Sequence, residues 1–559
     1  MNILIFPVIF FIIRHLTKNK IVKIFAITLA VLLSSFVPKA YCQKTDADGK
    51  NTVTIAVISL NDFHGGFVRN DHKSIPGAPA IVGTVDSLKL RYPNHIVLSA
   101  GDNFGGSYFY KATGGALMPE FFNLLGVRIS AVGNHEFDDG QQSLANKWRD
   151  IPSRPNGWDI TYVCANVRNQ AGAVPAFAQP FLADTLAVGK KKIVVSFVGL
   201  LASSTPQQAS VSKLKGLSFD GNYPRVLDSV KHLPGYGSVE KADVRLLLTH
   251  IGTVMIDGKP TWDDKDSANL VKINDRCWDG IISSHSHKEV CGYINTAHYP
   301  VVQGLWHGEF LSLLKVKFDT LAMKVVDVVP ELCPVNPSIK LSPAALHLQS
   351  QIDSLLSVTK TKGGTPIGTK LTVAAEDLPH DRNSKYQQTE VGRLVCASYA
   401  EAYRSEAGLG DKAIVVGASH FGSIRSGFTK GPVSVLDVGE VLPFSNALKV
   451  YEISGKELRE LVNFGHHNKR FGWLQTSGLD IAQNGAGNVV KLTYKSPKGK
   501  VIPIRDITRC ILVADSFITD GGDGYSKEFF SSLKQLDNSC LPFTTDAFIN
   551  YLRTFKTID

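Results

Sequence analysis

This chain of 559 residues is 44% hydrophobic and 20% charged, a composition typical of folded globular proteins that excludes a disordered chain and a membrane protein with many spans. Its formal charge is +10, but five cations and no carboxylates lie in the first 42 residues, so the remainder carries only +5. Because the basic residues form no runs and do not alternate with aromatic residues, we expect no nucleic-acid polymer as a partner.

An export signal is the first element that the sequence predicts, at residues 1–42. The run 24–37 holds fourteen mainly apolar residues, follows three lysines and is too short to span a bilayer comfortably. Cleavage just before Gln43 would leave no stable transmembrane span and place the protein in the periplasm, the extracellular space or at the cell surface. A lipid anchor on Cys42 is the less favoured alternative, because Tyr41 and Lys39 are poor residues before a modified cysteine.

Export to an oxidising compartment would allow cysteines to pair. Seven follow Cys42, an odd number that leaves at least one unpaired, and no C-x-x-C spacing indicates a cysteine zinc site. Two interpretations stay open: disulfides joining Cys277 to Cys291 and Cys510 to Cys540, or free buried thiols.

Short apolar runs rich in β-branched residues recur through the next part of the chain and predict strands buried on both faces. They lie at residues 53–60, 95–100, 128–132, 194–201, 244–249 and 279–284. Helical segments at 80–92 and 117–125 lie between them, so residues 43–340 are expected to form a layered α/β domain.

A helix at 341–358, starting near Ser342 and Pro343, is predicted to connect this domain to a second one. We therefore place a linker helix at 341–360 and a second α/β domain at 361–559. Its expected helices lie at 390–404 and 455–464, and its expected strands at 414–417 and 448–453.

Polar clusters follow five strands of the first domain, where open α/β sheets bind ligands. They are Asp62-Phe63-His64, Gly101-Asp102-Asn103, Gly133-Asn134-His135-Glu136-Phe137-Asp138, Thr249-His250 and His285-Ser286-His287. Carboxylates mixed with imidazoles suit Zn, Mn, Fe or Co better than Ca or Mg. Two divalent ions that share Asp102 would each receive about four ligands from Asp62, His64, Asp102, Asn134, His250, His285 and His287.

These motifs resemble the calcineurin-like metallophosphoesterases, and G-N-H-E-F-D resembles the 5′-nucleotidase branch, which includes bacterial periplasmic UDP-sugar hydrolase/5′-nucleotidases. The resemblance covers nearly the whole chain after the leader. It implies a four-layer sandwich domain followed by a C-terminal α/β substrate-binding domain. It also implies that Asp62, His64, Asp102 and His287 hold one ion, and that Asp102, Asn134, His250 and His285 hold the other. Ser284 departs from the glycine that more often precedes H-x-H in the family.

The resemblance makes His135 and Asp138 a catalytic pair, in which the carboxylate orients the imidazole. A protonated His135 would offset negative charge while a water activated by the metal ions attacks phosphorus in line. The alternative role for His135 is to brace its loop.

Two further motifs in the second domain resemble the family's nucleoside pocket: Pro443-Phe444-Ser445-Asn446 and Phe517 followed by Gly521-Gly522-Asp523-Gly524-Tyr525. By this resemblance Phe444 and Phe517 sandwich the base, Asn446 meets the base edge and Asp523 accepts hydrogen bonds from ribose hydroxyls. The candidate phosphate-binding cations are Arg425, Lys385 and Arg382.

Two departures from the family pattern lie near this pocket. Lys385 stands where bacterial relatives carry an arginine, so it keeps the charge without the planar fork. His420-Phe421-Gly422-Ser423 stands where the family has Asn-x-Gly-Gly, which adds bulk and new polar groups.

The sequence therefore predicts an exported two-metal phosphohydrolase that acts on nucleoside 5′-monophosphates, with UDP-sugars and other nucleotides as further candidate substrates. One alternative is a 2′,3′-cyclic-nucleotide 2′-phosphodiesterase/3′-nucleotidase, and an alternative of another class is a non-catalytic nucleotide-binding or surface protein. The partner is a small nucleotide bound between the two domains, with the helix at 341–358 as the expected hinge for closure. No particular oligomeric state is predicted.

Overall fold

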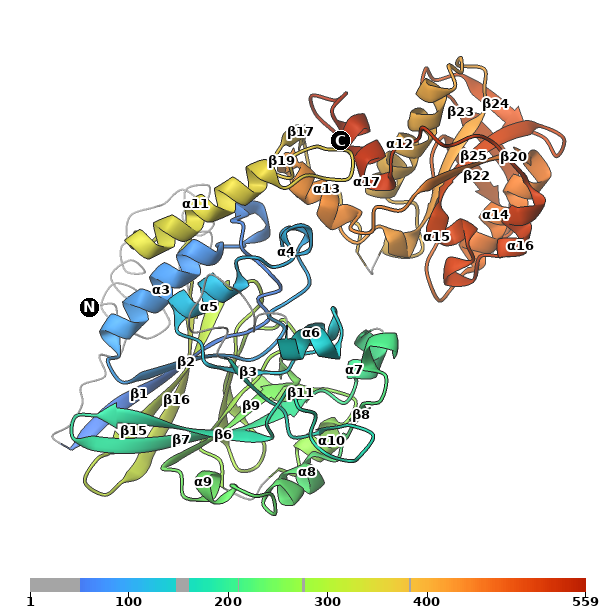
Figure 1. Cartoon of the computed structure of the whole chain (residues 1–559). Helices are drawn as coiled ribbons and strands as arrows, with labels where there is room; N and C mark the ends of the chain where they lie inside the picture. Colours follow the sequence, from blue (N-terminus) through green and yellow to red (C-terminus); the bar gives the residue numbers. More distant parts are fainter. Residues whose placement is uncertain (1–50, 147–159, 210, 274–276, 382–383) are drawn as a thin grey trace, which may run out of the picture.

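The computed structural model describes residues 51–146, 160–209, 211–273, 277–381 and 384–559. The predicted export signal and Arg382 lie outside these ranges. The described chain forms two lobes, the first running from blue through green to the yellow helix that ends it and the second mainly orange to red in Figure 1.

The first lobe is built on two six-stranded sheets. In the first sheet β1 pairs with β2, β2 with β3 and β3 with β4 in the same direction. At the other side of β1, β15 pairs antiparallel with β1 and β16 pairs antiparallel with β15. The strands, in sheet order, are β16 (Lys324–Pro334), β15 (Phe310–Asp319), β1 (Thr52–Leu60), β2 (His95–Ser99), β3 (Ile129–Ala131) and β4 (Thr161–Val163).

The second sheet also has parallel strands at its centre, but an antiparallel strand at each edge. Its strands, in sheet order, are β13 (Val290–Ile294), β14 (Tyr299–Gln303), β12 (Gly280–Ile282), β9 (Val244–His250), β7 (Lys191–Leu201) and β6 (Phe181–Val188). Since neighbouring parallel strands end at the same sheet edge, the loops after β9 and β12 emerge together.

Apolar side chains between the two sheets, such as Val57, Phe197 and Leu246, are fully buried. The outer face of the first sheet packs against α3 (Ala78–Arg91) and α5 (Met118–Leu125), and that of the second against α8 (Tyr223–Val230) and α9 (Gly237–Glu240). Helix, sheet, sheet and helix make the four expected α/β layers.

Shorter elements complete this lobe. They are α4 (Tyr108–Thr113), α6 (Gln141–Asn146), α7 (Thr205–Gln208), α10 (Ser267–Leu270), the pairs β5 (Val167–Arg168) with β8 (Ser218–Phe219) and β10 (Gly252–Ile256) with β11 (Lys259–Asp263), and the 3-10 turns η1 (Asp71–Lys73), η2 (His135–Phe137) and η3 (Val211–Leu214).

The predicted connecting helix is α11 (Pro343–Val358), drawn in yellow in Figure 1. It begins where expected, because the Ser342 side chain accepts a hydrogen bond from the Ala345 N–H and Pro343 occupies the first helical turn. The helix packs along α3 and α5, so it forms part of the first lobe.

The second lobe contains a five-stranded sheet, a three-stranded sheet and a two-stranded pair. The five strands are, in order, β21 (Leu474–Thr476), β18 (Val415–His420), β25 (Arg509–Asp515), β20 (Leu448–Ser454) and β26 (Lys534–Gln535). The smaller sheets are β22 (Leu479–Gln483), β23 (Val489–Lys495) and β24 (Val501–Ile504), and β17 (Lys370–Ala374) with β19 (Gly431–Ser434). The helices and 3-10 turns are α12 (Glu390–Glu406), α13 (Val435–Val441), α14 (Gly455–His467), α15 (Ser516–Thr519), α16 (Lys527–Ser532), α17 (Thr544–Leu552), η5 (Phe421–Ser423) and η6 (Gly522–Gly524).

The two lobes touch where α4 meets α13. The Tyr108 N–H donates a hydrogen bond to Glu440, and the Lys111 ammonium donates one to the Pro443 carbonyl. In the described part of the chain, no helix combines the length and the apolar character needed to cross a bilayer. The seven described cysteines are all free, so neither disulfide considered from the sequence is present in this structure.

Candidate active site

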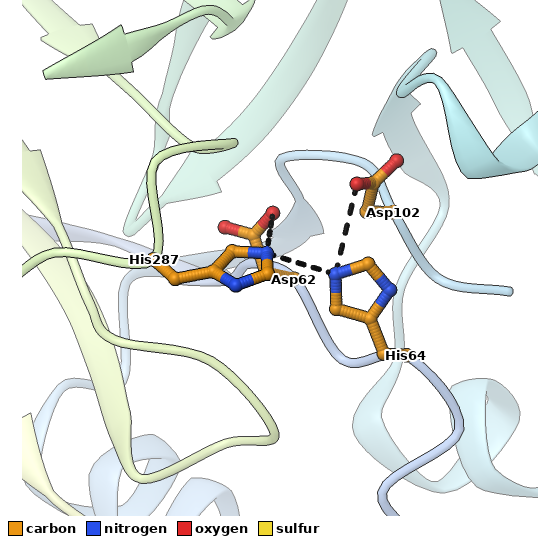
Figure 2. Close-up of side chains that lie close together, drawn as sticks. All are labelled: Asp62, His64, Asp102 and His287. Atoms are coloured by element: carbon orange, nitrogen blue, oxygen red, sulfur yellow. Dashed lines mark hydrogen bonds and ion pairs between the residues drawn. The ribbon is translucent and has the colours of Figure 1, made fainter. Parts of the chain in front are cut away.

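The ends of strands in the first lobe, and the loops that follow them, bring the predicted metal ligands together. Asp62 and His64 follow β1, Asp102 follows β2, and His287 follows β12. In this first group, His64 Nε2 lies 3.0 Å from His287 Nε2 and 3.6 Å from Asp102 Oδ2, and His287 Nε2 lies 3.6 Å from Asp62 Oδ1. Figure 2 shows these four side chains pointing toward one another, Asp62 and His64 from one loop and Asp102 and His287 from two others.

A second group adjoins the first through Asp102. His250 Nε2 lies 3.2 Å from Asp102 Oδ2 and 3.2 Å from His285 Nδ1. The same carboxylate oxygen of Asp102 therefore faces ligand atoms of both groups, which is the geometry that two ions sharing one carboxylate require. Asn134 follows β3 and is buried, with its Oδ1 atom lacking a hydrogen-bond partner, and the N–H of the next residue, His135, donates to Asp102 Oδ1.

The ring nitrogens of the predicted histidine ligands can bind cations. Burial lowers the pKa of both His64 and His285, so both imidazoles are neutral and present lone pairs at neutral pH. The His250 Nδ1–H donates to the Ala100 carbonyl over 2.8 Å, which leaves Nε2 free as a ligand atom. Burial lowers the pKa of His250, but Asp102 outweighs it and raises the pKa to about 9, so a bound cation would displace a proton there.

Five of the predicted ligands have left-handed backbone conformations that non-glycine residues rarely adopt. Their φ values are 48° for Asp62, 47° for His64, 52° for Asp102, 84° for His285 and 55° for His287. Such strain persists only where the surrounding structure holds it, and it clusters at functional sites.

Glu136 is one of the residues that hold this strain. Its buried carboxylate accepts hydrogen bonds from the backbone N–H groups of Asp102, Asn103 and Gly133, so it ties together the loops after β2 and β3. The close contact between these two loops requires glycine at position 133, because a Cβ atom there would lie 2.2 Å from Asp102 Oδ1. Sequence reasoning quoted Glu136 within its motif but assigned it no role.

The predicted pair of His135 and Asp138 lies beside the metal-ligand groups. His135 Nδ1 is 2.7 Å from Asp138 Oδ2, and the ring meets that of His64 edge-on at 4.9 Å. Burial lowers the pKa of His135, but Asp102 and Asp138 together raise it to about 9. The imidazole is therefore protonated at neutral pH and carries positive charge next to the cluster.

The second lobe contains a cavity of about 1330 Å³. Every predicted substrate-binding residue that the structure describes lines it: Phe444, Asn446, Phe517, Asp523, Arg425 and Lys385. The predicted metal ligands do not belong to the lining of this cavity. The first lobe contributes Lys73 to the lining, and the charge of Lys73 also acts on His307, whose ring lies 6.1 Å from that of His64.

Each of the two lobes matches the model of a known domain family. Residues 55–289 match the family model described as calcineurin-like phosphoesterase, and residues 366–530 match the model of the 5′-nucleotidase C-terminal domain. The chain belongs to the 5′-nucleotidase family of calcineurin-like metallophosphoesterases. It is therefore a phosphoric ester hydrolase, and its family implies divalent metal ions at the centre described above.

Two relatives with similar sequences differ in how much of their own length this chain covers. It is 25% identical over 430 residues to the endonuclease YhcR of Bacillus subtilis, covering 74% of this chain but 33% of that protein. It is 24% identical over 546 residues to an apyrase of Tabanus yao, covering 90% of this chain and 92% of the apyrase. The chain thus spans about a third of the first relative and nearly all of the second.

A solved structure, that of a 5′-nucleotidase precursor from Thermus thermophilus, matches with a TM-score of 0.57 at 22% identity. The match covers 90% of this chain and 97% of the other. It confirms the predicted fold class, a calcineurin-like sandwich domain followed by a 5′-nucleotidase C-terminal domain.

Within this metallophosphoesterase the structure explains one departure from the family's motifs. The Ser284 hydroxyl donates a hydrogen bond to Asp62 Oδ2 over 2.8 Å, and Asn61 Nδ2 donates to the same oxygen over 2.8 Å. Ser284 therefore adds an orienting contact to a predicted metal ligand.

Two other neighbours of the ligands were missed from the sequence. The Gln208 amide nitrogen lies 3.1 Å from His285 Nε2, and the Trp306 ring stacks on His287 with centroids 5.0 Å apart. Neither belongs to a motif, and only the tertiary structure brings them to the site.

Proposed function

We propose that this chain hydrolyses the phosphate ester of nucleoside 5′-phosphates at a two-ion centre, with the nucleoside held in the cavity of the second lobe. The observation that carries the proposal is that the described base-binding, sugar-binding and phosphate-binding candidates line one cavity. Sequence motifs nearly 140 residues apart, around Lys385 and Asp523, supply these side chains.

Asp62, His64, Asp102 and His287 would hold one ion, and Asp102, Asn134, His250 and His285 the other. Mixed carboxylate, amide and imidazole donors suit Zn, Mn, Fe or Co. When bound, the two ions would neutralise phosphoryl charge and lower the pKa of water so that it can attack phosphorus. The shared Asp102 oxygen keeps the two positions close together.

His135 supplies charge and a proton. Asp138 holds Nδ1, so the ring is fixed and its Nε2–H is available to the phosphoryl oxygens or the leaving oxygen. A proton held on this imidazole by Asp138 would stabilise the negative charge that develops as the ester bond breaks.

The cavity suits a nucleoside. Phe444 and Phe517 are 52% and 43% exposed, unusual values for phenylalanine that leave ring surface free for a base. The volume of about 1330 Å³ exceeds the roughly 300–1,000 Å³ of ordinary ligand pockets, so nucleoside diphosphates and their sugar derivatives would also fit. The names of the apyrase and 5′-nucleotidase relatives agree with a nucleotide substrate.

The phosphate must reach the metal-ligand groups from the cavity, and we therefore retain closure of the lobes as part of the proposal. Since α11 packs on α3 and α5, it would move with the first lobe. The pivot would then lie after α11 in the chain, near residues 359–369. A crosslink between the lobes that leaves turnover unchanged would contradict closure. Export, supported by the predicted leader at 1–42, would expose the enzyme to nucleotides outside the cytoplasm.

The test is phosphate release from 5′-AMP, ATP, UDP-glucose, 3′-AMP and 2′,3′-cyclic AMP, with chelation and metal add-back. We expect activity that chelation abolishes, that metal restores and that is highest on 5′-nucleotides. Preference for the cyclic or 3′ substrates would assign the alternative phosphodiesterase function. Absence of hydrolysis with each of Zn, Mn, Fe and Co would overturn the proposal.

A further inference from the structure

Gln208 lies beside a predicted metal ligand, and the proposed function gives it no role. It ends α7, its side chain is exposed, and its amide nitrogen lies 3.1 Å from His285 Nε2. The other ring nitrogen of His285, Nδ1, lies 3.2 Å from His250 Nε2. We call the ion position that Asp102, Asn134, His250 and His285 would form the second ion position. His285 therefore turns Nδ1 toward the second ion position and Nε2 toward Gln208.

The main chain before and after α7 fixes the place of Gln208. The Ala202 N–H donates a hydrogen bond to the His250 carbonyl over 2.9 Å, so the segment before α7 is tied to a predicted ligand. The Thr205 hydroxyl donates to the Ala202 carbonyl over 2.7 Å, and the Ala209 N–H donates to the Thr205 carbonyl over 3.0 Å. Gln208 thus stands on backbone that is anchored to the strand end carrying His250.

A metal-binding imidazole needs a partner for its remaining proton. A neutral imidazole has one lone pair and one N–H, so a ring that binds a cation through Nδ1 carries its proton on Nε2. An acceptor for that N–H orients the ring and raises its basicity toward the metal. His250, which faces the second ion position with Nε2, has the Ala100 carbonyl in this role, 2.8 Å from its Nδ1. Among the described residues, Gln208 has the side chain that lies within hydrogen-bond distance of His285 Nε2.

The amide of Gln208 can supply the acceptor that His285 requires. A glutamine amide has two N–H donors on its nitrogen and two lone pairs on its oxygen, and a half-turn about the last side-chain bond exchanges the places of the two atoms. After that half-turn Oε1 would accept the Nε2–H of His285. Because the side chain is exposed, water can solvate the amide nitrogen in the new orientation.

We propose that Gln208 is a positioning residue of the second ion position: its side-chain carbonyl accepts the Nε2–H of His285 and so directs the Nδ1 lone pair of that ring toward the ion. Gln208 itself binds no ion. The inference rests on the proposed function, because that function assigns two ions to the site. It adds a contribution of α7 to a set of ligands that otherwise comes from strand ends and the loops after them.

The experiment titrates the metal-depleted chain with Mn²⁺ and measures the bound ions by equilibrium dialysis. We expect the wild type to bind two Mn²⁺ ions, and Gln208→Leu to bind one of them unchanged and the other about 10–100-fold more weakly, the usual loss when the partner of a metal-binding histidine is removed. Anomalous X-ray scattering at an intermediate Mn²⁺ concentration identifies which position has weakened. We expect the second ion position.

A carboxylate at position 208 should restore binding, because it accepts the Nε2–H and cannot donate. The matched controls are Gln207→Leu and Gln207→Glu, since Gln207 is exposed in the same helical turn. Gln207→Glu also measures the effect of the added negative charge alone. We expect Gln208→Glu to bind both ions at least as tightly as Gln207→Glu does.

Three results would overturn the proposal. The first is a loss of less than about fivefold in Gln208→Leu relative to Gln207→Leu, well below the usual cost of removing such a partner. The second is an equal loss at both ion positions, or a loss confined to the other position. The third is weaker binding by Gln208→Glu than by Gln207→Glu, since the amide would then act as a donor or only as packing.

Metal binding also separates this inference from the proposed function. If the wild type bound two Mn²⁺ ions but hydrolysed no nucleotide, the proposed function would fail, and a selective loss at the second ion position in Gln208→Leu would still support the role of Gln208. If the wild type hydrolysed 5′-nucleotides and Gln208→Leu bound both ions as Gln207→Leu does, the proposed function would stand and this inference would fail. Binding of fewer than two ions by the wild type would reject both.

Discussion

The metal-ligand groups of the first lobe and the cavity of the second lobe differ in how firmly the structure holds their side chains. The predicted ligands Asp62, Asp102 and His250 are at most 1% exposed, and several adopt strained backbone conformations tied down by buried hydrogen bonds. In the cavity, Phe444 and Phe517 are about half exposed. The groups proposed to carry the chemistry are thus held by many contacts, whereas the two rings proposed to bind the base are held by few.

The departures from the family's motifs follow the same division. At the metal-ligand groups, Ser284 changes a neighbour of a ligand and removes no donor atom. Around the cavity, Lys385, His420 and Ser423 change groups that belong to its lining. The reaction type can therefore be read from the first region more securely than the substrate can be read from the second.

The largest effect should come from His135→Ala, which tests whether the chemistry is confined to the first region. We expect kcat to fall by about 10²–10⁴-fold, the usual range for a general acid. Bound metal should stay unchanged by elemental analysis, because no role as ligand is proposed. The matched control is His232→Ala, an exposed histidine of the same lobe. Equal kinetics of His135→Ala and wild type would contradict the assigned role.

Glu440 tests the contact between the two lobes that carry these regions, because it accepts the Tyr108 N–H across that contact. Burial raises its pKa to about 7, above the 4.5 of an ordinary glutamate, so the native state binds the proton more tightly than the unfolded state. The unfolding free energy should therefore fall as pH rises from about 4.5 to about 7, by at most about 3 kcal/mol. Glu440→Gln keeps an acceptor for the Tyr108 N–H without titrating.

The measurement is denaturant unfolding of the wild type and of Glu440→Gln, both in the presence of a metal chelator, at pH 5 and pH 8. The stability of the wild type relative to the variant should be lower at pH 8. The same difference at both pH values would show that Glu440 does not titrate in the native state across this window.

Phe444→Ala tests whether the second region recognises the base and nothing else. Removing one stacking ring should raise KM for AMP by about 5–100-fold, corresponding to roughly 1–3 kcal/mol of stacking. The kcat/KM for p-nitrophenyl phosphate should stay within about twofold, because that substrate lacks a nucleobase. Phe464→Ala serves as control, since Phe464 is exposed in the same lobe and does not line the cavity. Equal losses on both substrates would contradict base stacking.

The strands that carry the metal ligands could be predicted because they are continuous apolar runs. The run 53–60 became β1 (Thr52–Leu60), and the run 244–249 became β9 (Val244–His250). The long hairpin of β15 and β16 was not predicted, and its pairing with β1 joins residues such as Ser59 and Ser312 that lie far apart in the chain. Periodicity reports which residues are buried, whereas sheet order depends on such distant pairing.

Within the site, ligand types could be predicted from motifs that follow strands, and their grouping around Asp102 from resemblance. The role of Glu136 could not, because a carboxylate that accepts backbone N–H groups leaves no signature in the sequence of its donors. Lys73 gave no signal either, since it reaches the cavity from the other lobe. Contacts of this kind exist only once the loops have folded against each other.

The smallest effect should come from Ser284→Ala, which tests whether the other hydrogen bonds that Asp62 accepts are enough to position its carboxylate. Asp62 would lose the Ser284 hydroxyl but keep the hydrogen bonds from Asn61 Nδ2 and the His285 N–H. Loss of a hydrogen-bonded neighbour of a metal ligand typically costs about 10–100-fold in metal affinity or activity, and the remaining donors should limit it to less than about tenfold here. Ser283→Ala is the matched control, because the Ser283 hydroxyl donates to the Ile251 carbonyl and contacts no predicted ligand. Metal titration of both variants measures the effect, and a loss above about tenfold confined to Ser284→Ala would mean that this one hydroxyl, and not the set of donors, positions Asp62.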